Sequence, residues 1–168
     1  NTDEAVAEGR TSPPTFFIGA RKQAGMTSKT IFEQIRDGEI PARIIHETET
    51  TLAFLDAHPL ARGHTLVVPK EPYEHLQDLP PELSADLFAT VRELTPTIEA
   101  AVEADATTIG VNNGEASGQE VPHVHVHIIP RFEGDNSGPI HAIAIDSPEF
   151  SEAELDEIAD AIDDEQSA

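Results

Sequence analysis

The sequence has no cysteine and no long hydrophobic run, and both absences restrict what the protein can be. Without cysteine, the 168-residue chain forms no disulfide and holds no metal through thiolates. No apolar run approaches the ~20 residues that a membrane helix needs, and the apolar stretch 16–18 is too short for a signal peptide. The composition therefore predicts a cytoplasmic protein with one domain and no membrane partner.

Basic residues are also scarce. Ten Lys and Arg stand against 32 Asp and Glu, so the formal net charge is −22, and only three of the basic residues are lysines. Nucleic-acid binding needs a basic face, so we expect no nucleic-acid partner. Such a charge repels itself and weakens the compact state at low salt, whereas molar salt shortens the screening length to roughly 3 Å. This indicates adaptation to a salt-rich cytoplasm, as in halophiles; an ordinary acidic protein is the alternative.

Three segments differ in pattern. Residues 1–27 include Pro13-Pro14 and show no sustained period, which predicts a disordered leader, with a short ordered arm as the alternative. Residues 28–145 contain the periodic elements and form the predicted domain. Residues 146–168 carry no Lys or Arg, and the pair Ser151 and Glu154 matches a capping box, which predicts an acidic C-terminal helix and tail.

The pattern within the domain predicts an α+β fold, with an antiparallel meander of about five or six strands and two or three helices. Ser28 is the expected cap of a short helix over about 30–37. Pro80-Pro81 opens a long helix, which Pro96 should bend. Pro130 should end the strand that precedes it. Strands are expected over 43–48, 51–56, 64–69, 108–112, 123–129 and 140–145.

Three alternating histidines, His123, His125 and His127, give the strongest chemical signal. Because side chains alternate along a strand, the three imidazoles should share one face. A histidine-rich edge strand facing water is one alternative, and a cupin-like metal site is another. At about 3.3 Å per residue, the outer two histidines cannot both reach one zinc ion at ~2.0–2.1 Å without severe bending. Two adjacent histidines with a distant third ligand remain feasible.

A nucleophilic role fits this triplet better. A neutral imidazole attacks phosphorus and forms a labile N–P bond, which divides one difficult step into two easier ones. The central residue, His125, has neighbours on both sides that can fix its tautomer and offset phosphate charge, so it is the predicted nucleophile. The loop before it contains Gly114 and Gly118, whose backbone N–H groups can approach phosphate oxygens closely.

The segment His123–Arg131 resembles the histidine-triad (HIT) motif, in which histidines alternate with hydrophobic residues. The resemblance extends over about residues 28–135 through the segments Ile31-Phe32, Gly38–Pro41, Leu52–Asp56, Gly63–Lys70 and Asn113–Gln119. It implies a HIT fold, a homodimer, and a nucleotide hydrolase or transferase that cleaves at the α-phosphate. The reaction would pass through a nucleotidyl-histidine and release a nucleoside monophosphate. The implied substrates are dinucleoside polyphosphates, nucleoside phosphoramidates and acyl adenylates.

The resemblance also implies a role for each matching residue. In the catalytic group, His123 would position the nucleophile His125, and His127 and His64 would contact phosphate. Asp56 would bind the ribose hydroxyls. The apolar slot for the base would consist of Ile31, Phe32, Ile35 and Phe54. The phosphate site would be lined by Asn112, Gly118 and Gln119, with Glu120 close by. No metal site and no required cofactor are implied, although Mg²⁺ can accompany a polyphosphate substrate.

Two positions depart from the family pattern. Many bacterial relatives carry a Cys-x-x-Cys pair where Thr30 and Glu33 stand and a histidine where Pro72 stands, so we expect no structural zinc site. The residue after Gln119, often Ser or Thr and linked to protonation of the leaving group, is Glu120. The leaving-group step therefore stays open, and a nucleotide-binding regulatory protein with little turnover is the alternative function.

The charge predicts how salt changes activity. Turnover of a nucleotide by this −22 protein should rise with KCl up to molar levels, because salt screens both the self-repulsion of the chain and its repulsion of an anionic substrate. Initial rates across a KCl series, with circular dichroism at each point, test this. A flat or falling rate in protein that stays folded throughout would contradict it.

Overall fold

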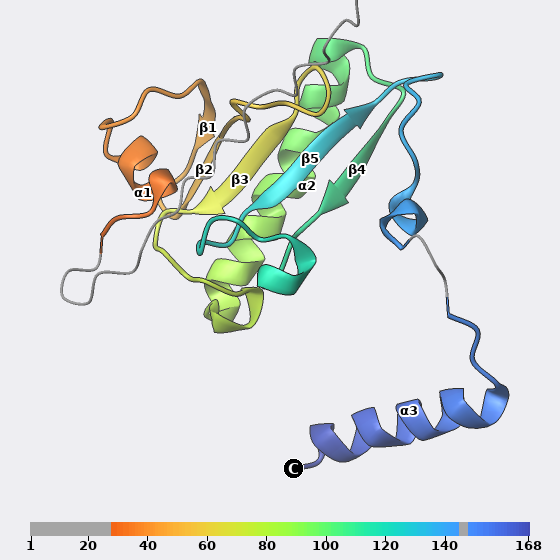
Figure 1. The fold of residues 1–168 in the computed structure, drawn as a ribbon. Coiled ribbons are helices and arrows are strands. Elements are labelled where there is room, and N and C mark those ends of the chain that lie inside the picture. Colours follow the sequence, from red (N-terminus) through yellow and green to blue (C-terminus); the bar gives the residue numbers. More distant parts are fainter. Residues whose placement is uncertain (1–27, 145–147) are drawn as a thin grey trace, which may run out of the picture.

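The computed structural model describes residues 28–144 and 148–168, and the predicted leader over 1–27 lies outside them (Figure 1). The described ranges contain five strands and three helices. In chain order these are α1 (Ile31–Arg36), β1 (Ile44–Glu47), β2 (Thr51–Leu55), β3 (Thr65–Pro69), α2 (Pro81–Val102), β4 (Ala106–Gly110), β5 (Val126–Arg131) and α3 (Glu152–Gln166).

The five strands form one antiparallel sheet in the order β1-β2-β3-β5-β4. The first three strands follow one another as a meander. The chain then crosses through α2 to β4 at the sheet edge and returns as β5 between β3 and β4 (Figure 1). This confirms the predicted α+β class. It also gives β5, which contains His127, a strand neighbour on each side.

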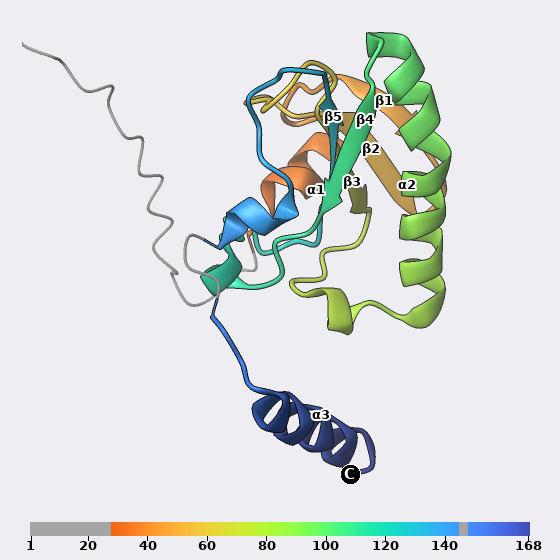
Figure 2. The same ribbon diagram turned by 90° about the vertical axis from the view of Figure 1, so that its right-hand side faces the viewer.

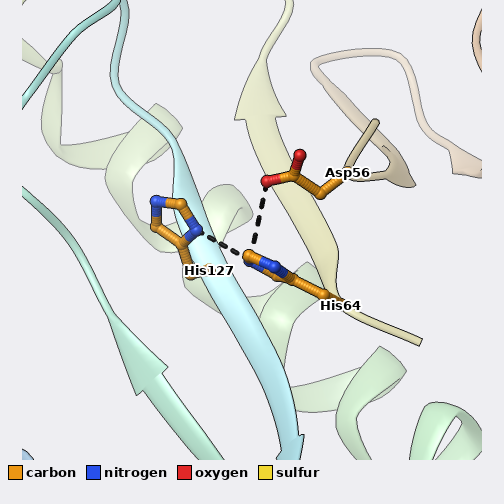
Figure 3. Close-up of side chains that lie close together, drawn as sticks. All are labelled: Asp56, His64 and His127. Carbon is orange, nitrogen blue, oxygen red and sulfur yellow. Dashed lines mark hydrogen bonds and ion pairs between the residues drawn. The ribbon is translucent and has the colours of Figure 1, made fainter. Parts of the chain in front are cut away.

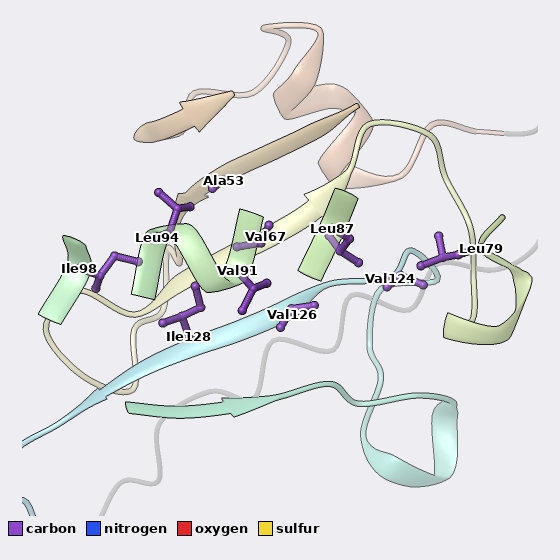
Figure 4. Close-up of a cluster of buried hydrophobic side chains, with 10 residues drawn as sticks. All are labelled: Ala53, Val67, Leu79, Leu87, Val91, Leu94, Ile98, Val124, Val126 and Ile128. Atoms are coloured by element: carbon purple, nitrogen blue, oxygen red, sulfur yellow. The ribbon is translucent and has the colours of Figure 1, made fainter. Parts of the chain in front are cut away.

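Helix α2 covers one face of the sheet (Figure 2). It begins at Pro81, whose missing N–H is no loss in a first turn, and it runs without interruption through Pro96. Its apolar side chains recur at helical spacing and meet the strands in a buried cluster (Figure 4). The cluster consists of Ala53, Val67, Leu79, Leu87, Val91, Leu94, Ile98, Val124, Val126 and Ile128.

Helix α1 packs on the opposite face, where it covers a second cluster. The cluster consists of Phe32, Ile35, Leu52, Phe54, Leu66 and Val68. A helix of six residues is not stable alone, so this burial and its cap hold it. The cap is Thr30, not Ser28 as predicted, because the Thr30 hydroxyl accepts from the Glu33 N–H and the Glu33 carboxylate accepts from the Thr30 N–H.

The predicted ends of β5 were wrong at both sides. The regular strand begins at Val126, after two of the three histidines, and it continues through Pro130 to Arg131. The ladder with β3 ends at Ile128, so Pro130 has a strand partner only in β4. A proline is tolerated where one side of a strand is unpaired.

The strand predicted over 140–145 was also wrong. Ile140–Ile143 forms a 3₁₀ turn, and Ile145 lies outside the described residues. Alternating apolar residues suggested a strand, but Ile140 and Ile143 are both exposed, and neither edge of the sheet pairs with this segment. The alternation therefore does not reflect a half-buried strand here.

The C-terminal helix α3 lies apart from the sheet (Figure 1). Ser151 and Glu154 form the predicted capping box, and every residue of the helix is exposed. Among the helices of the described ranges, none combines the length and the apolar character that crossing a membrane requires.

Candidate active site

The three histidines lie on the sheet face that α1 covers. Val124, Val126 and Ile128, which alternate with them, are buried against α2 on the other face. The first part of this segment is irregular, since the Val124 N–H donates to the carbonyl of Tyr73 and not to a strand. The side chains alternate nevertheless, and the His125 and His127 ring centroids are 5.0 Å apart.

Both ring nitrogens of His123 have partners. Its Nε2–H donates to the Pro69 carbonyl over 2.8 Å, so the neutral ring accepts at Nδ1 from the Thr30 hydroxyl over 2.7 Å. The ring is 1% exposed, and this burial lowers the pKa of His123. Thr30 therefore joins the first turn of α1 to the triad, and no ring nitrogen of His123 is left to bind a metal.

His125 presents one ring nitrogen without a partner. Its Nδ1 lies 2.8 Å from the carbonyl oxygen of His123, which can only accept, so Nδ1 carries a proton and donates. In the neutral ring the lone pair then resides on Nε2, which bonds to no residue in the described ranges. The Phe32 ring packs edge-on against both imidazoles, with centroids 5.4 Å from His123 and 5.1 Å from His125. The result is a fixed ring with a free lone pair.

His64 and His127 form a hydrogen-bonded pair (Figure 3). The Leu60 N–H donates to Nδ1 of His64, so a neutral His64 carries its proton on Nε2 and donates it to Nδ1 of His127 over 2.9 Å. His127 then carries its own proton on Nε2. That atom is buried, and no described residue accepts from it. An unpaired buried donor beside the free lone pair of His125 is suited to an anionic oxygen.

The same environment holds these two rings neutral. Burial, together with the neighbouring imidazoles of His125 and His64, lowers the pKa of His127 to about 4. Burial also lowers the pKa of His64, although the Asp56 carboxylate acts in the opposite direction. A neutral His127 is the form that has one donor and one acceptor, as the pair requires.

Asp56 completes a small cluster with this pair (Figure 3). One of its carboxylate oxygens lies 3.7 Å from Nε2 of His64, and the other accepts from the His58 N–H. One potential ligand atom from each of Asp56, His64 and His127 lies within 4.8 Å of the other two, close enough to hold a metal ion. The triad itself does not converge in this way, because His123 is sequestered at Pro69 and Thr30.

The predicted base slot is largely buried. Phe32, Ile35 and Phe54 pack in the cluster under α1. Only Ile31 presents a large exposed surface, with 44% of its area accessible. The buried residues therefore support this surface from below and would not each contact a base.

The predicted phosphate loop is shaped largely by Gln119. Its Oε1 accepts from the Gly114 N–H, and its Nε2 donates to the carbonyls of Glu74 and Val121. Gly118 adopts a left-handed φ of +94°, which favours glycine. Asn112 and Glu120 are exposed. Gln119 thus holds the loop in place, while Asn112 and Glu120 face solvent.

Sequence analysis missed three groups that orient the histidines: the Thr30 hydroxyl, the Leu60 N–H and the Pro69 carbonyl. The spacing of Thr30 and Glu33 is itself a capping-box signature, so Thr30 could have been found. The two backbone groups carry no side-chain signal, because any residue type provides them.

Comparison with known proteins places the chain among similar sequences and folds. The HIT domain family matches residues 37–134. An uncharacterised HIT-like protein of Methanocaldococcus jannaschii is 41% identical over 128 residues, which cover 76% of this chain and 94% of that protein. The asymmetrical bis(5′-nucleosyl)-tetraphosphatase of Schizosaccharomyces pombe is 41% identical over 98 residues, covering 58% of this chain and 54% of that enzyme.

The fold also matches a solved structure. A crystal structure from Streptococcus mutans superposes with a TM-score of 0.75 and 33% identity, covering 88% of this chain and 91% of that one. The fold described above, with its five-stranded sheet, therefore occurs in a solved structure of similar sequence.

The bond between Thr30 and His123 predicts a loss of stability in Thr30→Val. This variant lacks the α1 cap and leaves Nδ1 of His123 buried without a donor, so unfolding should become about 2–4 kcal/mol easier. Thr30→Ser keeps the hydroxyl and should cost less than ~1 kcal/mol. Denaturant unfolding in molar KCl measures both variants. A loss of stability in Thr30→Ser with none in Thr30→Val would show that the methyl group, and not the hydroxyl, matters.

The neutral histidines predict acid sensitivity. In the unfolded chain an imidazole binds a proton once the pH falls below its ordinary pKa of about 6.5. In the folded protein, His127 binds a proton only when the pH approaches its lowered pKa of about 4. The unfolded state thus binds more protons, so the free energy of unfolding should fall as the pH drops from about 6.5 towards 4. Unfolding at several pH values in His127→Gln should give a shallower slope than in the wild-type protein. An unchanged slope would remove His127 as a source.

Proposed function

This chain belongs to the histidine-triad (HIT) family, some of whose members hydrolyse nucleotides, and we propose that it is itself a nucleotide hydrolase or transferase attacking an α-phosphate. The observation that carries the proposal is the uncommitted Nε2 lone pair of His125, next to the unpaired Nε2–H of His127. One atom can attack phosphorus, and the other can donate to a phosphate oxygen. Candidate substrates are dinucleoside polyphosphates, nucleoside phosphoramidates and acyl adenylates.

In the first step, Nε2 of His125 uses its lone pair to form a bond to the α-phosphorus. The bond from phosphorus to the leaving group breaks, and the leaving group keeps the electron pair. The imidazole becomes cationic as a nucleotidyl-histidine, and the Nδ1–H bond to the His123 carbonyl stabilises this charge. Because His123 is held at two points, the nucleophile stays aimed without reorganising during the reaction.

In the second step, a water oxygen attacks the same phosphorus and the P–N bond breaks. The electron pair returns to Nε2 of His125, the water releases its proton to solvent, and the nucleoside monophosphate leaves. Every group named in these steps belongs to the chain, the substrate or water, and we propose that the reaction requires no metal cofactor, although Mg²⁺ can accompany polyphosphate substrates. We further propose that the protein acts as a homodimer with the nucleotide as its small-molecule partner.

The nucleophile predicts the behaviour of His125→Ala. This variant should lose more than ~10³-fold in turnover, because its covalent step is gone, while AMP binding stays within a few-fold of the wild-type value. The assay incubates each protein in molar KCl with diadenosine tetraphosphate, an adenosine phosphoramidate or an acyl adenylate, and follows AMP release. His75→Ala, which changes a histidine outside the site, serves as the matched control.

Two outcomes would contradict the proposal. Comparable rates in His125→Ala and the wild-type protein would remove the nucleophile. Tight AMP binding by a wild-type protein that turns over none of the three substrates would favour a nucleotide-binding regulatory protein.

A further inference from the structure

Arg36, the last residue of α1, connects this helix to the end of β3. Its Nε and one Nη donate to the two carboxylate oxygens of Asp37, which are 2.8 and 3.1 Å away. The other Nη donates to the backbone carbonyl of Lys70, the residue that follows β3. A guanidinium is a rigid planar fork, so a carboxylate that holds one edge of it fixes the direction of the remaining donors. Asp37 therefore aims Arg36 at Lys70.

The ion pairs around Arg36 use cations that are scarce in this chain. Nζ of Lys29 lies 2.8 Å from a carboxylate oxygen of Asp37, and it also bonds to Glu39. Two of the ten Lys and Arg residues of the chain thus stand at a helix of six residues. Ion pairs at a surface contribute little to stability, and molar salt screens them further. Their effect here is orientation, since they hold the Arg36 guanidinium beside β3.

Lys70 belongs to the segment that supports His123. Its N–H donates to a carbonyl of the turn between β1 and β2 over 2.8 Å. In the same peptide group, the Pro69 carbonyl accepts from Nε2–H of His123 over 2.8 Å. The ladder between β3 and β5 ends two residues earlier, at Val67, so this end of β3 pairs with β2 alone. The bond from Arg36 thus fixes the end of the strand on which His123 depends.

The backbone of His123 itself lies outside the sheet ladder. β5 begins three residues later, and the His123 N–H donates to the Val121 carbonyl in a local turn. The position of the His123 carbonyl, which accepts from Nδ1–H of His125, therefore depends on the bonds of its own side chain. Helix α1 provides one of these bonds directly through Thr30 and supports the other through Arg36.

Arg131 is held in a similar way, but its donors lead elsewhere. Two of its N–H groups donate to Asp135. The other three donate to the Thr108 hydroxyl and to the carbonyls of Ser137 and Gly138. These groups lie along a cleft of about 690 Å³ that β4 and β5 line, and none of them bonds to a histidine ring in the described part of the chain. What distinguishes the arginine of α1 is therefore the acceptor that it reaches.

The bond to the His123 carbonyl decides how many molecules are ready to attack phosphorus. A neutral imidazole samples both tautomers unless a partner selects one. With the carbonyl in place, the proton of His125 stays on Nδ1 and the lone pair on Nε2. If the carbonyl moves, some molecules carry the proton on Nε2, and these have no lone pair to offer. Substrate still binds to them, because the Nε2–H of His127 is unchanged.

We propose that Arg36 is a positioning residue, which acts through the end of β3 on His123 and thereby keeps the lone pair of His125 on Nε2. The kinetic consequence rests on the proposed function, whereas the tautomer can be measured whether or not the protein turns over a nucleotide. Arg36 sets the fraction of molecules that hold the reactive tautomer. Loss of its bond should therefore lower kcat and leave KM unchanged.

The tautomer of His125 provides the first test. Proton–nitrogen correlation spectra of isotopically labelled histidine, in mildly alkaline buffer with molar KCl, show which ring nitrogen carries the proton, and His125→Ala assigns the signals. The wild-type ring should carry it on Nδ1. In Arg36→Gln the fraction with the proton on Nε2 should rise at least ~5-fold, because one hydrogen bond that supports the carbonyl is gone. An unchanged His125 signal in this variant would overturn the proposal.

Kinetics provides the second test, with whichever substrate the wild-type protein turns over fastest. Arg36→Gln should lower kcat ~5-fold or more and leave KM within ~2-fold of the wild-type value. Arg92→Gln, the same change at an exposed arginine of α2, is the matched control and should alter neither the kinetics nor the His125 signal. A higher KM with unchanged kcat would show that Arg36 supports binding only, and the proposal would be wrong.

Asp37→Asn keeps Arg36 and removes the carboxylate that aims it. Because this change lies at the surface, it also serves if Arg36→Gln does not fold by circular dichroism. It should raise the fraction of His125 with the proton on Nε2 at least ~2-fold, and a wild-type signal would overturn the proposal. If the wild-type protein turns over none of the substrates, the proposed function fails, and the spectra alone decide the role of Arg36.

Discussion

The site depends on the direction of one hydrogen bond, from Nδ1 of His125 to the backbone carbonyl of His123. A carbonyl oxygen cannot donate, so this bond decides which nitrogen of the His125 ring keeps its lone pair. The carbonyl can impose the choice only if it does not move. Thr30 and Pro69 supply that rigidity by holding the His123 ring from both sides, one from the first turn of α1 and one from the end of β3.

The sheet presents different surroundings on the two sides of this bond. Helix α1 and the strands under it form an apolar cluster on one side, and β4 with β5 lines a cleft on the other side. His127 stands between the two, with its ring oriented by His64 and its Nε2–H uncommitted. Because β5 is inserted between β3 and β4, one short segment serves both sides at once.

Much of this arrangement follows from sequence, for physical reasons that also set the limits. The helical period from Leu87 to Ile98 and the alternation around His125 reflect burial on one face, which periodicity records directly. The pairing of His64 with His127 cannot be predicted from periodicity, since 63 residues separate them and only the strand register brings them together. The prediction of the α1 cap was wrong for a related reason. Ser28 and Thr30 are equally suitable hydroxyls, and the packing of α1 on the triad selects the second.

Arg131 and Asp135 form an ion pair that responds to acid differently from the imidazoles of the site. The Arg131 guanidinium stays protonated in any ordinary buffer, and it holds the pKa of the Asp135 carboxyl well below its usual range. His127, four residues earlier in β5, takes up a proton in milder acid, near its lowered pKa of about 4. Acidification should therefore place a positive charge on the His127 ring while the ion pair of Arg131 with Asp135 stays intact.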